Sequence, residues 1–132
     1  LQVLVYPVTD CNFQTRSHKK FADGYMLTRD LMKWIWDQYL IDKRDATDPY
    51  VSPLRAGNLR DLPEALVLTA EYDPLCDEGE AYARRLMAAG VKVRHSRYDG
   101  VVHGFFRMTN RVDRARQALQ EVSSAIKNAL HG

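Results

Sequence analysis

The chain has 132 residues, of which 45% are hydrophobic and 27% are charged, as in an ordinary globular domain. Its formal net charge is +2, and basic and acidic residues are interleaved, which argues against a nucleic-acid-binding surface. No apolar run approaches the roughly 20 residues that span a bilayer, and the two cysteines form neither a metal-binding spacing nor a disulfide framework. We therefore expect a cytoplasmic domain with no membrane span, no metal and no nucleic-acid partner.

Leu1 to Tyr6 is a short apolar run, rich in Val and Leu, that ends at Pro7. This pattern predicts a buried parallel strand that is covered on both faces. Because the chain opens inside this strand and without Met, we expect it to be the later part of a longer protein. Residues 8–27 have no clear periodicity and are expected to form a loop with a short helix.

Residues 28–41 show the 3.6-residue period of a helix, with Thr28 as the expected N-cap. Apolar side chains form a broad stripe along this helix, and we expect Trp34 and Trp36 to pack rather than to contact a substrate. Residues 42–63 contain several Pro and Gly residues and predict a long connection, a kind of segment that often carries function.

A second, almost wholly apolar run covers residues 65–70 and predicts another buried strand. The helix expected after this strand begins at Asp77, with Glu80 three residues on as in a capping box. It is expected to continue to about Ala89, because Gly90 is a typical C-terminal stop.

Residues 91–98 alternate apolar and polar at their start, which is typical of a half-exposed edge strand. The last helix is expected over about residues 110–130. Strands alternate with helices in this order, so we expect an α/β fold with a parallel sheet. The first strand is too apolar to form a free edge, which implies a partner strand outside these three.

Two residues that could carry chemistry follow neighbouring strands. Asp73 lies just beyond Ala70, and His103 lies just beyond Tyr98. Ligands of parallel sheets bind at the carboxyl ends of the strands, so the two side chains could meet there. A carboxylate that orients an imidazole makes the acid and base of a hydrolytic triad. Asp99 is closer to His103 in sequence, but Asp99-Gly100 is typical of a turn.

Taken alone, this pair is a weak signal. An Asp before Pro is most often a turn or cap residue, and a His before Gly is most often a surface loop residue. The other three histidines lack the spacing of metal ligands and are expected to be solvated; these are His18, His95 and His131.

A resemblance covers nearly the whole chain. The stretches Glu71-Tyr72-Asp73-Pro74-Leu75-Cys76-Asp77-Glu78-Gly79 and Tyr98-Asp99-Gly100-Val101-Val102-His103-Gly104-Phe105 resemble the C-terminal part of the hormone-sensitive-lipase-like carboxylesterases, which have the α/β-hydrolase fold. The resemblance implies that residues 1–132 are the C-terminal portion of such a catalytic domain. It also implies that the three parallel strands, with flanking helices, are the sixth to eighth of an eight-stranded sheet. By position, the triad acid of the family falls on Asp73 and its histidine on His103.

The chain departs from the family pattern in two ways. Cys76 stands where the family usually has Arg, which affects local ion pairs. The G-x-S-x-G elbow of the nucleophile and the His-Gly-Gly turn of the oxyanion hole are absent from the sequence. None of the serines lies in such an elbow; they are Ser17, Ser52, Ser96, Ser123 and Ser124. We therefore expect the isolated chain to be inactive.

The leading hypothesis is a cofactor-free serine carboxylesterase for short- to medium-chain esters, to which this chain contributes the acid and base. Its partners would be the ester, the missing N-terminal part and, in a homodimer, a second copy paired through the edge from Val91 to Tyr98. The alternative is a non-catalytic module that folds by docking on a partner or by dimerising. A weaker alternative is a thiol nucleophile, with Cys76 or Cys11 near His103.

Overall fold

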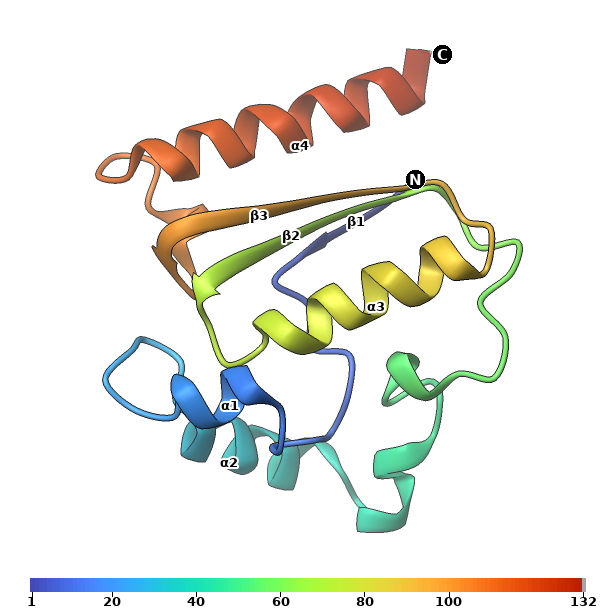
Figure 1. Ribbon diagram of the computed structural model, residues 1–132, viewed down its shortest axis with the longest axis vertical. Helices are drawn as coiled ribbons and strands as arrows, with labels where there is room; N and C mark the ends of the chain where they lie inside the picture. The colour runs from blue at the N-terminus through green and yellow to red at the C-terminus, as the bar shows by residue number, and fades with distance from the viewer. Residues whose placement is uncertain (132) are drawn as a thin grey trace.

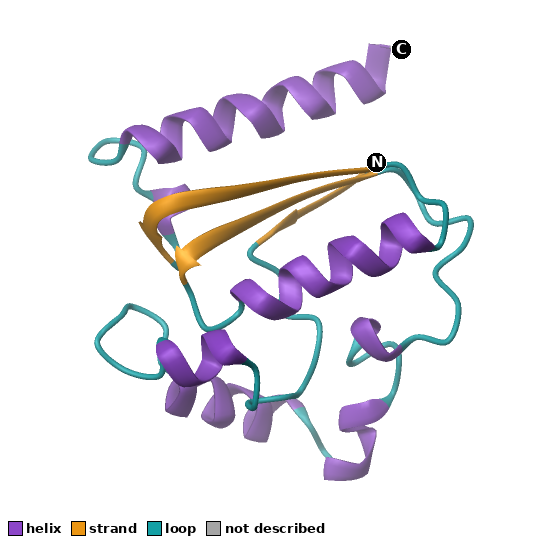
Figure 2. Cartoon of the chain, viewed as in Figure 1, coloured by secondary structure: helices purple, strands orange, loops and turns teal. Residues whose placement is uncertain are grey.

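The computed structural model describes residues 1–131 as a parallel sheet with helices on both faces (Figures 1 and 2). The sheet order is β1-β2-β3. The strands are β1 (Gln2–Val5), β2 (Ala65–Tyr72) and β3 (Val93–Val102), and the α-helices are α1 (Arg16–Lys20), α2 (Arg29–Tyr39), α3 (Cys76–Ala88) and α4 (Asp113–His131). Short 3-10 helices cover Lys43–Thr47, Pro53–Arg55 and Phe105–Arg107. The expected α/β class with three parallel strands is confirmed.

Strand β2 is the centre of the sheet, and both of its faces are covered. Leu66, Leu68 and Ala70 point toward α4, where they pack with Ala118 and Phe105. The intervening residues point to the other face and pack against α3. A strand that alternates between two apolar layers has no polar face, which explains the continuous apolar run in the sequence.

Helix α3 packs very closely on the sheet at Gly79. A Cβ atom at this position would lie 3.0 Å from Cγ2 of Thr69 and 3.5 Å from Cδ of Pro7. Glycine therefore lets the first turn of α3 approach the carboxyl ends of β1 and β2, where the next layer of the molecule begins.

Helices α1 and α2 form that layer, below the start of α3 in Figure 1. An apolar cluster in this layer consists of Met32 and Trp36 of α2 with Leu27 and Leu75, which precede α2 and α3. Thr28 is the N-cap of α2, as expected, and its Oγ1 accepts a hydrogen bond from the Leu31 amide at 3.1 Å. Trp36 is buried as predicted, but Trp34 is 59% exposed, so the prediction that it packs is wrong.

Two local predictions are corrected. Helix α3 begins one residue before Asp77, with Leu75 as its N-cap, so Asp77 is not the cap. Asp99 and Gly100 lie within β3, because that strand continues beyond Tyr98. The dipeptide occupies an irregularity in the β2–β3 pairing, where Gly100 has a positive φ of 79°. Its turn propensity is used inside the strand rather than at the strand's end.

Candidate active site

Asp73 follows β2 directly and is completely buried. Its Oδ1 accepts a hydrogen bond from the Leu75 amide at 2.8 Å, and its carbonyl accepts one from the Cys76 amide. The side chain therefore closes a tight turn that leads into α3, the ordinary role of an Asp before Pro. This turn fixes the carboxylate and leaves Oδ2 for another donor.

His103 follows β3, and the irregularity in that strand brings it level with Asp73. Before the irregularity Ala70 pairs with Tyr98, whereas after it Tyr72 pairs with Val102. The extra residues in β3 therefore align the next position of each strand, Asp73 with His103. Gly104, with a φ of 82°, then turns the chain sharply toward the buried Phe105.

The two side chains form a short hydrogen bond. Nδ1 of His103 lies 2.7 Å from Oδ2 of Asp73. The carboxylate accepts, so Nδ1 carries the proton and Nε2 is left as the basic ring nitrogen. The His103 side chain is 25% exposed, whereas that of Asp73 is fully buried. Asp99 is engaged elsewhere, because it accepts a hydrogen bond from Arg97 at 3.0 Å.

Tyr6 packs against the imidazole from the end of β1. The two ring centroids are 4.3 Å apart. Tyr6 has a φ of 39°, a conformation that is rare for a residue with a side chain and that costs of order 1–3 kcal/mol. Burial raises the pKa of its phenol, Arg107 opposes this shift and Asp73 adds to it. The strained backbone thus holds an aromatic ring beside His103.

An apolar cavity of about 460 Å³ opens next to His103. Its walls come from the segment after β1, from α2 and from the connection that follows α2. They contain no charged side chain apart from the ionisable His103; the lining residues are Val8, Leu27, Met32, Ile35, Trp36, Tyr39, Tyr50, Val51, Pro53, Leu75 and His103. Trp36 therefore both packs in the core and lines the cavity.

Comparison with known proteins identifies the family. A sequence profile described as alpha/beta hydrolase fold matches residues 1–107. The chain belongs to the α/β-hydrolase family. Its relatives include an ethyl acetate hydrolase from Pseudomonas putida, 39% identical over 98% of this chain and 41% of the relative. An arylesterase from Saccharolobus solfataricus is 43% identical over 79% of this chain and 34% of its own length.

Solved structures agree with this assignment. A hyperthermophilic esterase from the archaeon Pyrobaculum calidifontis superposes with a TM-score of 0.92 and 42% identity, over 98% of this chain and 43% of that one. The resemblance to the hormone-sensitive-lipase-like carboxylesterases is confirmed by these relatives. This α/β-hydrolase chain spans less than half the length of each of these relatives.

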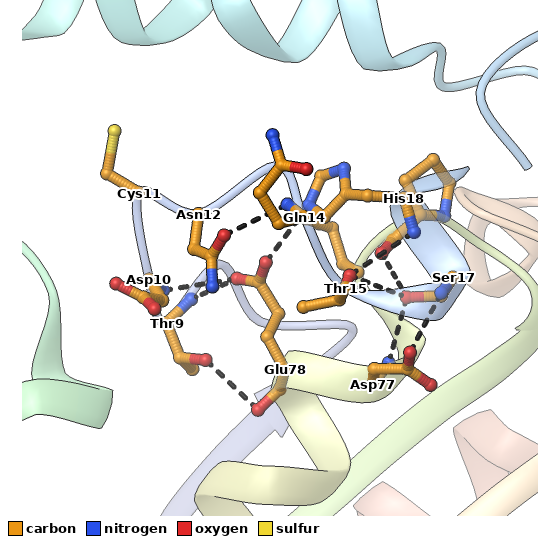
Figure 3. Close-up of polar contacts among 12 residues, drawn as sticks. Thr9, Asp10, Cys11, Asn12, Gln14, Thr15, Ser17, His18, Asp77 and Glu78 are labelled. Carbon is orange, nitrogen blue, oxygen red and sulfur yellow. Dashed lines mark hydrogen bonds and ion pairs between the residues drawn. The ribbon is translucent and has the colours of Figure 1, made fainter.

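A second histidine–carboxylate pair lies near the first turn of α3 in this α/β-hydrolase chain (Figure 3). Nε2 of His18 lies 3.2 Å from Oε2 of Glu78, and both side chains are 1% exposed. Oε1 of Glu78 accepts hydrogen bonds from the amides of Thr9 at 2.7 Å and Asp10 at 3.2 Å. The prediction that His18 is solvated is therefore wrong.

Sequence reasoning missed this cluster because its members are far apart in the chain. His18 and Glu78 are 60 positions apart, and no motif connects them. The available signal was the run of acidic residues at the start of a predicted helix packed on a sheet. A carboxylate on the face of this helix that packs against the sheet needs buried hydrogen-bond donors.

The cysteines do not have the properties of nucleophiles. Burial, with a contribution from Glu80, raises the pKa of the Cys76 thiol to about 12. Burial also raises the pKa of Cys11, and the nearby Asp10 adds to that shift. Because the thiolate is the reactive form, these surroundings disfavour the thiol alternative. Arg97, on β3, opposes the upward shift of the Cys76 pKa, and its guanidinium also lies within 4 Å of Glu71, Glu80 and Asp99.

Among residues 1–131, no helix is both long enough and apolar enough to cross a membrane.

Proposed function

We propose that this chain is the C-terminal part of a serine carboxylesterase and contributes the acid and base of its catalytic triad, Asp73 and His103. The observation that carries the proposal is the 2.7 Å hydrogen bond between Nδ1 of His103 and Oδ2 of Asp73 at the edge of an apolar cavity. A buried carboxylate on one ring nitrogen and an accessible second nitrogen are what a general base requires.

The reaction follows from this arrangement. A serine supplied by polypeptide outside these 132 residues attacks the ester carbonyl, and Nε2 of His103 takes the hydroxyl proton. Asp73 holds the tautomer and stabilises the imidazolium. His103 then gives the proton to the leaving alcohol, and an acyl-enzyme remains. Water, deprotonated by His103, releases the acid and restores the serine.

The proposed substrates are short- to medium-chain esters. The support is the cavity, which has about 460 Å³ of space and apolar walls beside His103. Such walls favour uncharged alkyl groups, because a charged group would lose its hydration without gaining a partner. We assign the cavity to the acyl chain of the ester.

The test is a chimera in which the part of the P. putida ethyl acetate hydrolase that precedes its match is fused to this chain. We expect the chimera to hydrolyse p-nitrophenyl acetate and the 132-residue chain alone not to. His103→Ala in the chimera should abolish turnover, and Asp73→Asn should lower kcat by about 10⁴-fold, as loss of a triad carboxylate does. His131→Ala, near the C-terminus and exposed, is the matched control and should leave kcat unchanged.

Near-normal turnover in the His103→Ala chimera would contradict the assignment of the base. Hydrolysis by the chain alone would contradict the proposed source of the nucleophile and would indicate a nucleophile within the chain. Circular dichroism of each variant distinguishes loss of chemistry from loss of the fold.

The competing proposal is a non-catalytic module that docks on a partner or dimerises. The favouring observation is that, within residues 1–131, β1 and β3 are both edges of the sheet. Pairing of two copies through residues 91–98 would cover the β3 edge. Sedimentation of the chain at low concentration tests this, because a stable, compact monomer would contradict it.

The proposal also includes a cytoplasmic location. Its support is that both cysteines are free thiols, which fits a reducing compartment. Alkylation of unreduced protein isolated from its native host, followed by mass spectrometry, would test this, because a disulfide-linked species would argue against it.

A further inference from the structure

We propose that Glu78 is a positioning residue that fixes the walls of the apolar cavity relative to His103. Glu78, His18 and the amides of Thr9 and Asp10 are called the Glu78 latch below (Figure 3). The inference rests on the proposed esterase function, because it assigns the cavity to the acyl chain. It adds a residue outside the triad on which selectivity among acyl chains depends.

Stability alone does not explain the Glu78 latch. A buried polar pair rarely stabilises a fold more than well-packed apolar residues of the same volume would. Nδ1 of His18 also has no hydrogen-bond partner among residues 1–131, which adds a desolvation cost. The hydrogen bonds fix the geometry instead, because the Glu78 carboxylate holds α3, α1 and the segment at Thr9 and Asp10 in a single arrangement.

The Glu78 latch controls two walls of the cavity through Thr9. Thr9 directly follows Val8, which lines the cavity. Its amide donates to Glu78, and its carbonyl accepts a hydrogen bond from the Leu54 amide at 2.9 Å. Leu54 follows Pro53, which lines the cavity from the other side. Removing the carboxylate therefore removes one anchor that both walls share, although neither wall touches Glu78.

The same cluster is attached to the turn that carries the triad acid. Ser17, next to His18, donates from Oγ to the Pro74 carbonyl at 2.6 Å. Its amide donates to Oδ2 of Asp77 at 2.8 Å, and its Oγ accepts from the Asp77 amide at 3.2 Å. Because Pro74 follows Asp73, the cavity walls and the acid share one hydrogen-bonded frame.

Hydrogen exchange of the 132-residue chain tests the latch without any need for catalysis. In the native chain we expect the amides of Thr9, Asp10 and Leu54 to be protected. Glu78→Ala should expose all three, while the amides of β2 remain protected. Glu78→Gln should keep the protection, because its Oε1 can accept from the two amides and its Nε2 can donate to His18. Glu80→Ala, two residues on in α3 and outside the latch, is the matched control.

Kinetics of the chimera test the consequence for the reaction. The quantity to compare is the ratio of kcat/KM for p-nitrophenyl hexanoate to kcat/KM for p-nitrophenyl acetate. We expect Glu78→Ala to lower this ratio by at least about tenfold, because loosened cavity walls contact the longer acyl chain less well. Glu78→Gln and Glu80→Ala should keep the ratio within about threefold of the unmodified chimera. Loss of folded protein alone would lower both rates together and leave the ratio unchanged.

His18→Phe breaks only one bond of the latch and keeps the inference testable if Glu78→Ala does not fold. Its ratio should fall between those of the unmodified chimera and Glu78→Ala, or clearly below that of Glu80→Ala if the alanine variant cannot be measured. An unchanged ratio in a folded variant with exposed Thr9 and Leu54 amides would overturn the inference. An inactive unmodified chimera would count against the proposed function, and hydrogen exchange would then test the latch by itself. Continued protection of the Leu54 amide in Glu78→Ala would overturn the inference. If that variant does not fold, exchange of the Thr9, Asp10 and Leu54 amides in His18→Phe that is no faster than in the unmodified chain would overturn it.

Discussion

The chain contains two histidine–carboxylate pairs that differ mainly in access. His103 binds Asp73 at 2.7 Å and is 25% exposed beside a cavity, whereas His18 binds Glu78 at 3.2 Å and is 1% exposed. Each carboxylate is buried; Asp73 lies in the turn before α3, and Glu78 lies in the first turn of that helix. The same two chemical groups, an imidazole and a carboxylate, therefore serve two purposes. An imidazole that must exchange protons with a substrate needs a free face, and one that only ties segments together does not.

The comparison is tested most sharply by making the same substitution in both pairs. In the chimera, His103→Gln should lower kcat by about 10⁴- to 10⁶-fold, since glutamine can still donate to Asp73 but cannot act as a base. His18→Gln should leave kcat for the acetate ester within about threefold, because its side-chain amide still donates to Glu78. Equal losses of kcat at both positions, measured by steady-state kinetics, would contradict the proposed difference in role between His103 and His18.

The Asp73–His103 pair follows from sequence, whereas the Glu78–His18 pair does not. Asp73 and His103 each follow an apolar run, and parallel strands bring such positions to one edge. The resemblance to esterases then adds the roles. The irregularity at Gly100 that aligns the two residues was not predicted, because its dipeptide is typical of a turn. Burial of His18 depends on a loop with no periodicity, so no pattern in the sequence indicated it.

The reactivity of Cys76 tests whether a second nucleophile lies near Asp73 and His103. With a thiol pKa of about 12, Cys76 holds far less thiolate at pH 8 than an ordinary cysteine. We expect iodoacetamide to modify it more than about 100-fold faster in urea-unfolded chain than in native chain. Mass spectrometry of timed samples measures this ratio. Rapid native alkylation, together with loss of any hydrolytic activity, would restore the thiol alternative.

A substitution at Gly79 tests the close approach of α3 to the sheet. Gly79→Ala should lower the free energy of unfolding by about 1–3 kcal/mol, because the new methyl group would press on Thr69 at 3.0 Å. The loss should exceed the gain of up to about 1 kcal/mol that Ala brings to a helix. Gly57→Ala is the control, since a Cβ there meets nothing within 4 Å. Urea unfolding measures both, and a stabilised Gly79→Ala chain would show that α3 can shift.

His95 provides the smallest expected effect and a third kind of histidine, whose ring contacts a threonine hydroxyl. Its Nε2 lies 3.0 Å from Oγ1 of Thr69, and burial lowers its pKa. The unfolded chain therefore binds this proton more readily than the folded chain. Stability from this group is complete above the unfolded-state pKa and declines as pH falls through it. We expect His95→Gln to reduce the loss of stability between pH 8 and pH 5.

Urea titrations at the two pH values measure this difference, with His131→Gln as the control because His131 is exposed. If the His95→Gln chain loses as much stability between pH 8 and pH 5 as the unmodified chain, other groups cause the loss of stability at low pH.

The strand pairings have different costs in chain entropy. β2 and β3 are joined through α3 alone, whereas β1 pairs with β2 across a connection more than twice as long. Each doubling of a flexible loop adds about 0.6 kcal/mol to the entropy cost of closing it, and distant contacts form more slowly. Asp73 and His103 both belong to the β2–α3–β3 unit. Their pairing therefore involves the more local part of the topology, and the Tyr6 ring depends on the long-range docking of β1.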